Sequence, residues 1–185
     1  MSKCGLNLTV EYPVSSREDW FDSRRPLQLV TLKSSTAMKF RKMFLRGFLR
    51  PGSCNLYIGL LNDKKLIGVY GFQNPDYGTY DLIMKADTSV PVPKLPVLLL
   101  MILKTQKMKV MLERKFNRDI NSILTKIFSK YPQSNRYRKT AKLVTKKEVE
   151  GGYDLSYLIT TGKYKTVKQA VSEWRQKYES NTKAN

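Results

Sequence analysis

Residues 55–72, which read NLYIGLLNDKKLIGVYGF, carry the clearest local structural signal in the chain. Two apolar runs, 56–61 and 65–72, are joined by the polar segment Asn-Asp-Lys at 62–64. Apolar runs of this length on either side of a short segment of turn-forming residues are typical of an antiparallel β-hairpin. The sequence therefore predicts two adjacent antiparallel strands.

Further elements are expected on both sides of this hairpin. Before it, apolar alternation and capping signals predict a strand at 6–12, a helical turn at 15–21, a strand at 28–33 and a helix at 37–46 that Ser35 or Thr36 caps. After it, the same signals predict a strand at 79–85, a long helix at 97–113, a strand in the second half of the ambiguous segment 117–129, a turn at 132–137, strands at 142–145 and 153–159, and a helix at 167–178. This order predicts a mixed α/β fold with a largely antiparallel central sheet flanked by helices. No linker-like run is long enough to divide the chain, so we expect one domain over 1–180 and a polar tail over 181–185.

The charge of the chain is strongly unbalanced. The sequence contains 34 Lys and Arg against 15 Asp and Glu, which gives a formal net charge of +19. Hydrophobic residues make up 41% of the chain, so the excess charge belongs to a folded body that repels itself. A nucleic acid is the simplest partner to justify this repulsion, because each neutralised phosphate releases condensed counterions. The alternative is a lysine-rich surface that serves solubility only.

Some chemistries are excluded by composition. The chain has no histidine, so it has no Ser-His-Asp triad, Cys-His pair or histidine metal site. Its two cysteines, Cys4 and Cys54, form neither a disulfide framework nor a metal-binding motif, which favours a reducing compartment and a cytoplasmic location. The N-terminus lacks the long apolar core of a secretory signal. The apolar stretch 97–103 is too short to span a bilayer and is expected to be a core helix.

Two acidic residues are candidates for chemistry in the strand and loop at 78–89. Asp81 and Asp87 are scarce acids in a basic chain, and Asp87 is followed by a Thr-Ser pair. In a site without histidine, such a carboxylate could orient or deprotonate a nucleophile. Two structural interpretations remain open: Asp87 organises the turn before the next helix, and Asp81 pairs with Lys85.

A second candidate region lies at 125–139, where basic residues alternate with tyrosine, serine and amide side chains. Lysine and arginine hold phosphates, while tyrosine can stack on a base. A solvated loop is the alternative interpretation. The candidate nucleic-acid-binding residues are Lys126, Lys130, Arg136, Tyr137, Arg138 and Lys139.

The hairpin, the segment GTYDLIMKADTSVP at 78–91, the helix after it and ILTKIFSKYPQSNRYRKTAKLV at 123–144 resemble a known family. They are similar to the phage-encoded Mom-like DNA-modification proteins, which have a GNAT-type acyltransferase fold. The resemblance covers about residues 36 to 145. The matching positions are Tyr80, Asp81, Asp87, Thr88, Ser89, Ser129, Ser134 and Tyr137.

This resemblance implies a GNAT-like enzyme that modifies a DNA base, adenine in Mom itself, at the splayed centre of its sheet. It implies Asp81, Asp87, Ser129 and Tyr137 as catalytic residues, DNA rather than RNA as partner, an anti-restriction role, and the cytoplasm of an infected bacterial host. The implied cofactor is acetyl-CoA or a related acyl donor. The Gly-rich turn that holds its pyrophosphate is replaced here by VPVPKLPVLLL at 90–100, which contains no glycine.

Two other functions remain open. One is a non-catalytic, basic DNA- or RNA-binding protein on the same scaffold, with a regulatory, structural or anti-defence role. The other is an acyltransferase that acts on a protein or a small acidic substrate, which the positive charge attracts.

Overall fold

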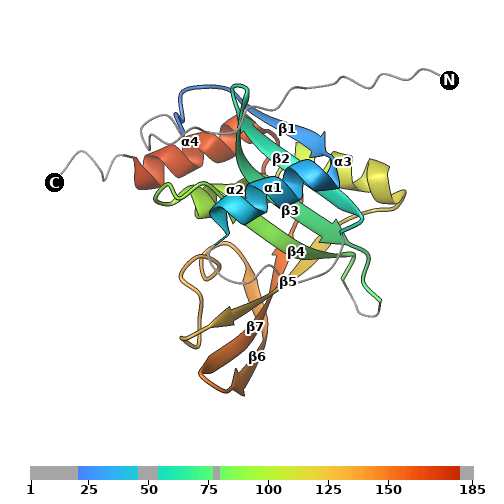
Figure 1. Ribbon diagram of the computed structural model, residues 1–185, viewed down its shortest axis with the longest axis vertical. Coiled ribbons are helices and arrows are strands. Elements are labelled where there is room, and N and C mark those ends of the chain that lie inside the picture. The colour runs from blue at the N-terminus through green and yellow to red at the C-terminus, as the bar shows by residue number, and fades with distance from the viewer. Residues whose placement is uncertain (1–20, 46–53, 77–79, 180–185) are drawn as a thin grey trace.

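A seven-stranded sheet organises the protein, and the computed structural model describes residues 21–45, 54–76 and 80–179 (Figure 1). The strand order is β1-β2-β3-β4-β5-β7-β6, and all neighbours are antiparallel except β4 and β5, which are parallel. The elements are β1 Leu27–Leu32, α1 Ser34–Phe44, β2 Leu56–Asn62, β3 Lys65–Gln73, β4 Leu82–Ser89, α2 Leu95–Leu103, α3 Gln106–Phe116, β5 Ser122–Ser129, β6 Lys142–Val149, β7 Gly152–Thr160 and α4 Val167–Tyr178. The expected mixed α/β class is confirmed. The strand predicted at 6–12 and nearly all of the helical turn at 15–21 lie outside the described residues.

The predicted hairpin is β2 and β3, which lie inside the sheet. Every residue of β2 is buried, as expected of a strand that has neighbours on both sides and helices on both faces. The turn is shorter than predicted because Asn62 still pairs with Lys65. Asp63 adopts φ 59°, a left-handed conformation that aspartate tolerates better than most residues.

Helices α1 and α2 cover opposite faces of this sheet. The Tyr70 hydroxyl on β3 donates to the backbone oxygen of Leu99 in α2, at 2.8 Å. The next residue, Gly71, is the partner of Tyr57 on β2, whose hydroxyl lies 3.8 Å from the sulfur of Met38 in α1. Because consecutive residues of a strand point to opposite faces, the two helices enclose the sheet between them.

The apolar segment at 97–103 forms most of α2 and is almost entirely buried, which confirms the expectation of a core helix. Gly68 of β3 allows this close packing, since a Cβ there would lie 2.9 Å from the Leu99 side chain. Within the described residues, no helix has the length and apolar character needed to cross a membrane.

The strand predicted at 79–85 is shifted toward the C-terminus. The observed strand, β4, runs from Leu82 to Ser89, so Asp87 lies inside the strand and not in a turn after it. The cause is the length of β3, which pairs with β4 as far as Gly68 opposite Ser89. The interpretation of Asp87 as a turn-organising residue is therefore wrong.

Several other boundaries also differ. The long helix predicted at 97–113 is two helices, because the Thr105 side chain accepts the Met108 N–H and starts α3. Helix α1 begins at Ser34 and has no side-chain cap, so the predicted caps Ser35 and Thr36 are wrong. The strand predicted at 142–145 extends to Val149, since it follows β7 to the turn at Gly151.

Candidate functional site

The two parallel strands in the middle of the sheet part from each other. Residues 82–84 of β4 pair with residues 123–125 of β5, after which β4 continues to Ser89 and β5 to Ser129. Over 85–89 the edge of β4 that faces β5 has no strand partner among the described residues. An unpaired strand edge presents backbone N–H and C=O groups that an extended ligand can bind.

Asp87 stands beside this parting and holds two side chains of the loop between β5 and β6. The Tyr137 hydroxyl donates to Asp87 Oδ2 at 2.5 Å. Arg136 Nη2 lies 2.6 Å from the same oxygen, as an ion pair without the alignment of a hydrogen bond. The Tyr137 ring stacks on Tyr157 of β7, with centroids 4.9 Å apart. Tyr137 therefore connects β4 to the strands on the other side of the parting.

The protonation of this cluster follows from its burial. The Tyr137 side chain is 1% exposed, and its burial, together with the nearby Asp87, raises the pKa of its phenol well above the usual value. For Arg136, burial opposes the charge, but the Asp87 carboxylate outweighs this effect and raises the pKa of the guanidinium. At neutral pH, Tyr137 is thus a proton donor and Arg136 is a cation.

The remaining matched residues near this end of β4 have other surroundings. Thr88 points away from Asp87, and its buried hydroxyl has no hydrogen-bond partner among the described residues. Ser89 is half-buried and pairs with Gly68 of β3. The Ser134 N–H donates to the Tyr157 hydroxyl at 2.8 Å, which fixes the loop that carries Tyr137.

Asp81 lies at the opposite end of β4. Its Oδ2 accepts the N–H groups of Asn121 and Ser122, at 2.7 and 2.8 Å, and the Ser122 hydroxyl at 3.1 Å. The carboxylate therefore joins the starts of β4 and β5, which also excludes the predicted pairing with Lys85 as its main contact. Asp87 is six residues further along the strand, about 20 Å away at the rise of a β-strand. The structure thus does not bring the two acids together.

Replacing Asp81 by asparagine is expected to lower the free energy of unfolding at pH 7 by about 1.5 kcal/mol, because hydrogen bonds to a charged acceptor are lost. Burial opposes ionisation of Asp81, but the N–H groups of Asn121 and Ser122 and the Ser122 hydroxyl outweigh it and lower its pKa. This contribution is therefore present above the unfolded pKa, which is about 3.8, and disappears as the pH falls through the folded pKa. Urea unfolding of both proteins at pH 7 and pH 3 measures this difference. An equal gap at both pH values would contradict it.

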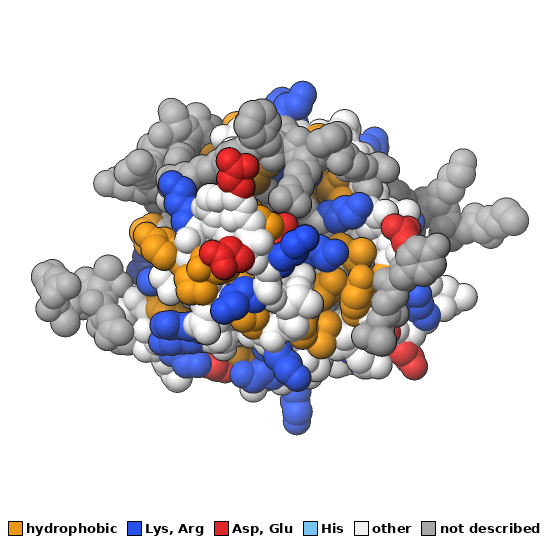
Figure 2. Space-filling model, turned by 90° about the horizontal axis from the view of Figure 1, so that it is seen from below, with side chains coloured by type: hydrophobic (Ala, Val, Ile, Leu, Met, Phe, Trp, Pro, Cys, Tyr) orange, Lys and Arg blue, Asp and Glu red, His pale blue; other side chains and the backbone are white. Residues whose placement is uncertain are grey.

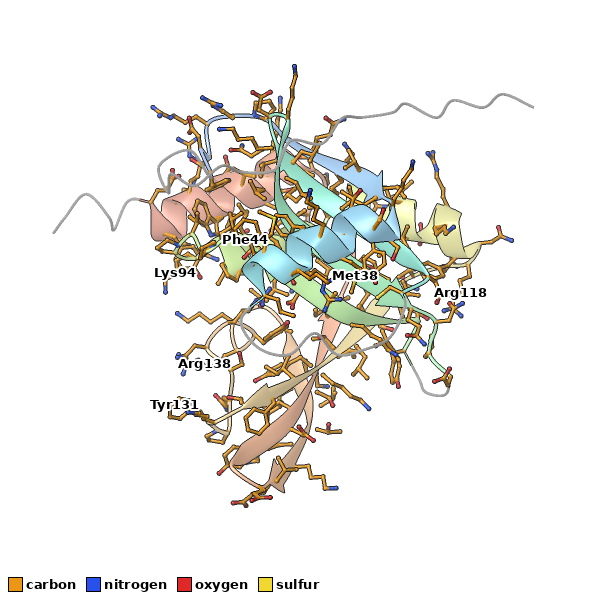
Figure 3. The ribbon with its side chains drawn as sticks, in the orientation of Figure 1. Met38, Phe44, Lys94, Arg118, Tyr131 and Arg138 are labelled. Atoms are coloured by element: carbon orange, nitrogen blue, oxygen red, sulfur yellow. The ribbon has the colours of Figure 1, made fainter. Side chains whose placement is uncertain are left out.

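The other predicted residues of this region lie on the arm formed by the ends of β5, β6 and β7, or on the β5–β6 loop. Ser129 ends β5, and its hydroxyl accepts the N–H of Tyr131 at 3.1 Å. Tyr131 is 72% exposed, and both it and Arg138 point outward from the loop (Figure 3). The predicted nucleic-acid-binding set is thus divided, since Arg136 and Tyr137 face inward. The members at the surface are Lys126, Lys130, Arg138 and Lys139.

Basic side chains are spread widely over the end of the molecule that carries the arm. Figure 2 shows Lys and Arg side chains distributed over this whole face among apolar ones, with acidic side chains between them. Among the described residues of this face, the positive charge forms no single stripe for a nucleic acid. A sharper concentration of lysines lies around a cavity between α2 and α4, which the sequence analysis missed because its lysines span residues 94 to 177.

The start of α2 is the place where the expected Gly-rich turn is absent. The Leu95 N–H bonds to Val92 O at 3.2 Å, and the Val97 and Leu98 N–H groups bond to Lys94 O at 3.0 and 3.2 Å. Pro96 has no N–H to offer. These backbone amides are therefore not available to hold a pyrophosphate, in agreement with the sequence of this turn.

One family description matches most of the chain, and several solved structures are similar to it. A comparison with curated protein sequences found no match. Similar solved structures include a probable acetyltransferase from Staphylococcus epidermidis ATCC 12228, with 10% identity, a TM-score of 0.47 and coverage of 74% of this chain and 99% of that chain. A GNAT-family acetyltransferase from Streptococcus pneumoniae has 9% identity, a TM-score of 0.48 and coverage of 74% and 100%. Residues 24–179 match the family described as phage GNAT-like domain. Since this match covers most of the chain, the protein belongs to the phage GNAT-like domain family.

Proposed function

We propose that this protein transfers an acyl group from a thioester donor to an amino group of a DNA base. Membership of the phage GNAT-like domain family supports acyl transfer. The observation that carries the proposal is the parting of β4 and β5, which leaves the edge of residues 85–89 unpaired beside Asp87 and Tyr137. An extended donor with amide groups can pair with this edge as an added strand does.

The cluster at the parting provides a proton donor. Tyr137 keeps its proton at neutral pH and donates it to Asp87, so in the proposed transfer the hydroxyl turns from Asp87 to protonate the leaving sulfur. Asp87 orients this phenol through the 2.5 Å hydrogen bond, and Arg136 balances the charge of Asp87. As the new N–C bond forms and the C–S bond breaks, the nitrogen loses one proton and the sulfur gains one. The net reaction therefore requires no oxidant, reductant or external acid.

DNA as the acceptor is supported by the charge of the chain and by the resemblance to Mom-like proteins. A net charge of +19 attracts a polyanion. Exposed cations lie on β5 and on the loop that carries Tyr137, and they are Lys126, Lys130, Arg138 and Lys139. A base in a duplex must leave the stack to meet a buried catalytic group. We therefore expect the modified base to be flipped or already unpaired.

A second candidate function is non-catalytic binding of nucleic acid on the same scaffold. The start of α2 favours this function, because its backbone N–H groups are already hydrogen-bonded or, at Pro96, absent. They therefore cannot donate to the pyrophosphate of an acyl-CoA. Tyr137 also bridges the gap between β4 and β7, since its hydroxyl bonds to Asp87 and its ring stacks on Tyr157. Such a protein would bind DNA or RNA with a steep dependence on salt and would not need the Tyr137 hydroxyl.

Mass spectrometry of nucleosides from cells that express the protein tests the proposal. We expect a nucleoside heavier by one acyl group, whose yield falls about 100-fold in the variant Tyr137→Phe, because general acid catalysis contributes at least this much. This variant keeps the ring that stacks on Tyr157. The control Tyr153→Phe removes a hydroxyl on the arm and leaves the yield unchanged. Unmodified DNA in a host that supplies acyl donors, with folded protein present, would contradict the proposal and favour the second candidate.

A further inference from the structure

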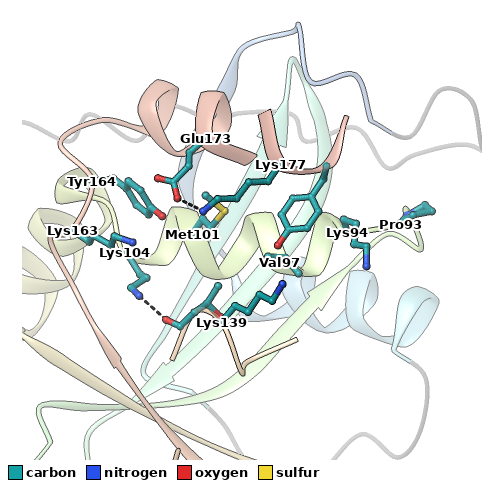
Figure 4. Close-up of a pocket in the computed structure, with 12 residues that line it drawn as sticks. Pro93, Lys94, Val97, Met101, Lys104, Lys139, Lys163, Tyr164, Glu173 and Lys177 are labelled. Atoms are coloured by element: carbon teal, nitrogen blue, oxygen red, sulfur yellow. Dashed lines mark hydrogen bonds and ion pairs between the residues drawn. The ribbon is translucent and has the colours of Figure 1, made fainter. Parts of the chain in front are cut away.

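A cavity of about 650 Å³ lies between α2, α4 and the loop that connects β5 to β6 (Figure 4). Its lining includes five lysines that come from separate parts of the chain. They are Lys94 before α2, Lys104 after α2, Lys139 on the β5–β6 loop, Lys163 before α4 and Lys177 within α4. Elements distant in the sequence thus place their cations around one space.

The positive charge of this cavity is poorly compensated. Glu173 is the one carboxylate among the lining residues, and it accepts a hydrogen bond from Lys177 Nζ at 2.6 Å. Five lysines and one glutamate leave the lining with a net charge of +4. The other four lysines form no ion pair among the described residues, so no carboxylate there neutralises their charges. Lys94 and Lys163 instead lie over the rings of Tyr178 and Tyr164.

Two of these lysines are close enough to oppose each other. Burial and the nearby charge of Lys163 lower the pKa of Lys104. Lys104 Nζ donates to the backbone oxygen of Thr140 at 2.5 Å, which ties the β5–β6 loop to the end of α2. Crowded like charges disfavour the compact state, and a bound anion removes this penalty.

The frame of the cavity is fixed by contacts between its walls. Trp174 of α4 donates from Nε1 to Lys94 O at 3.0 Å, which holds α4 against the start of α2. Apolar and aromatic side chains complete the wall, among them Val97, Met101 and Tyr178. A pocket of this volume, with apolar walls and converging charges, has the size and chemistry of a small-ligand site.

We infer that this cavity binds a di- or triphosphate chain, which the lysine side chains hold. They replace the backbone N–H groups at the start of α2, which are already hydrogen-bonded or, at Pro96, absent. The lysines supply the anion contacts, and the apolar wall can receive an attached nucleoside. The phosphate chain has two possible sources, the diphosphate of an acyl-CoA or a free nucleoside triphosphate. The acyl-CoA source rests on the proposed function, whereas the anion site does not.

Isothermal titration calorimetry of the full chain with sodium tripolyphosphate tests the site. We expect saturable binding that the triple variant Lys94→Gln, Lys139→Gln, Lys163→Gln weakens about 100-fold, since hydrogen bonds to charged groups are lost. The matched control is Lys142→Gln, Lys146→Gln, Lys147→Gln, which removes the same charge from the exposed arm. This control is expected to stay within about two-fold of the unmodified protein. Absence of binding, or equal weakening in both variants, overturns the inference.

Titrations with CoA and with ATP identify the source. Tighter binding of CoA than of ATP, lost in the cavity variant, assigns the site to an acyl donor. Equal or tighter binding of ATP assigns it to a free nucleotide. The outcome is separable from the proposed function: acylated DNA without tripolyphosphate binding removes this inference alone, and tripolyphosphate binding without modified DNA removes the proposed function alone.

Discussion

Replacing Asp87 by alanine is expected to lower the free energy of unfolding by about 3 kcal/mol, because it leaves a largely buried cation without its partner. The Asp87 and Arg136 side chains are only 18% and 26% exposed, so water replaces little of the lost interaction. The Tyr137 hydroxyl also loses its acceptor while its ring stays buried. Urea unfolding at pH 7, followed by circular dichroism, measures the change.

The control for this prediction is Glu179→Ala. Glu179 pairs with Arg175 one helical turn away, at 2.9 Å, but both side chains are exposed to solvent by more than a third. Its loss is expected to change stability by less than about 0.5 kcal/mol. Replacing the buried pair together, as Asp87→Leu with Arg136→Met, should recover much of the stability lost in Asp87→Ala, since no unpaired charge remains. A loss in Asp87→Ala no larger than in the control would contradict the role of Asp87.

The second large effect is expected at Trp174, which attaches α4 to α2. Its side chain is 4% exposed, it meets the Phe21 ring edge-on at 5.7 Å, and its Nε1 donates to Lys94 O. Trp174→Ala creates a large cavity between α4 and the core and is expected to lower the free energy of unfolding by about 3–5 kcal/mol. Thermal and urea unfolding of the full chain measure this loss.

The conservative variant Trp174→Phe separates packing from the hydrogen bond. It keeps an aromatic ring in the core and removes the indole N–H, so we expect a loss of about 1–2 kcal/mol. If both variants lose the same small amount of stability, α4 is not held to the core by this residue. In that case the cavity between α2 and α4 has no fixed frame.

Features that depend on local sequence could be predicted. The hairpin of β2 and β3 follows from two apolar runs and a polar turn, and the helix predicted at 167–178 has the bounds of α4. The strand predicted in the second half of the segment 117–129 is confirmed by β5. In these segments the pattern of residues itself indicates the type of element, although β5 pairs with the distant strands β4 and β7.

Features that depend on distant partners could not be predicted. The extent of β4 is set by β3, and at the break between α2 and α3 the backbone of Thr105 bridges to that of Tyr164. Asp87 and Tyr137 were both identified as candidates, but nothing in the sequence showed that one would bind the other. The lysines of the cavity come from five separate places in the chain, and none of these places has an unusual sequence pattern.

The most direct test of the unpaired edge of β4 as the donor site is the backbone amide NMR spectrum of the full chain during titration with acetyl-CoA. We expect the amide signals of residues 85–89 to shift and saturate, while those of β2, which is paired on both edges, stay in place. If saturating acetyl-CoA leaves the signals of residues 85–89 unmoved, no donor pairs with this edge and the proposed acyl transfer is wrong.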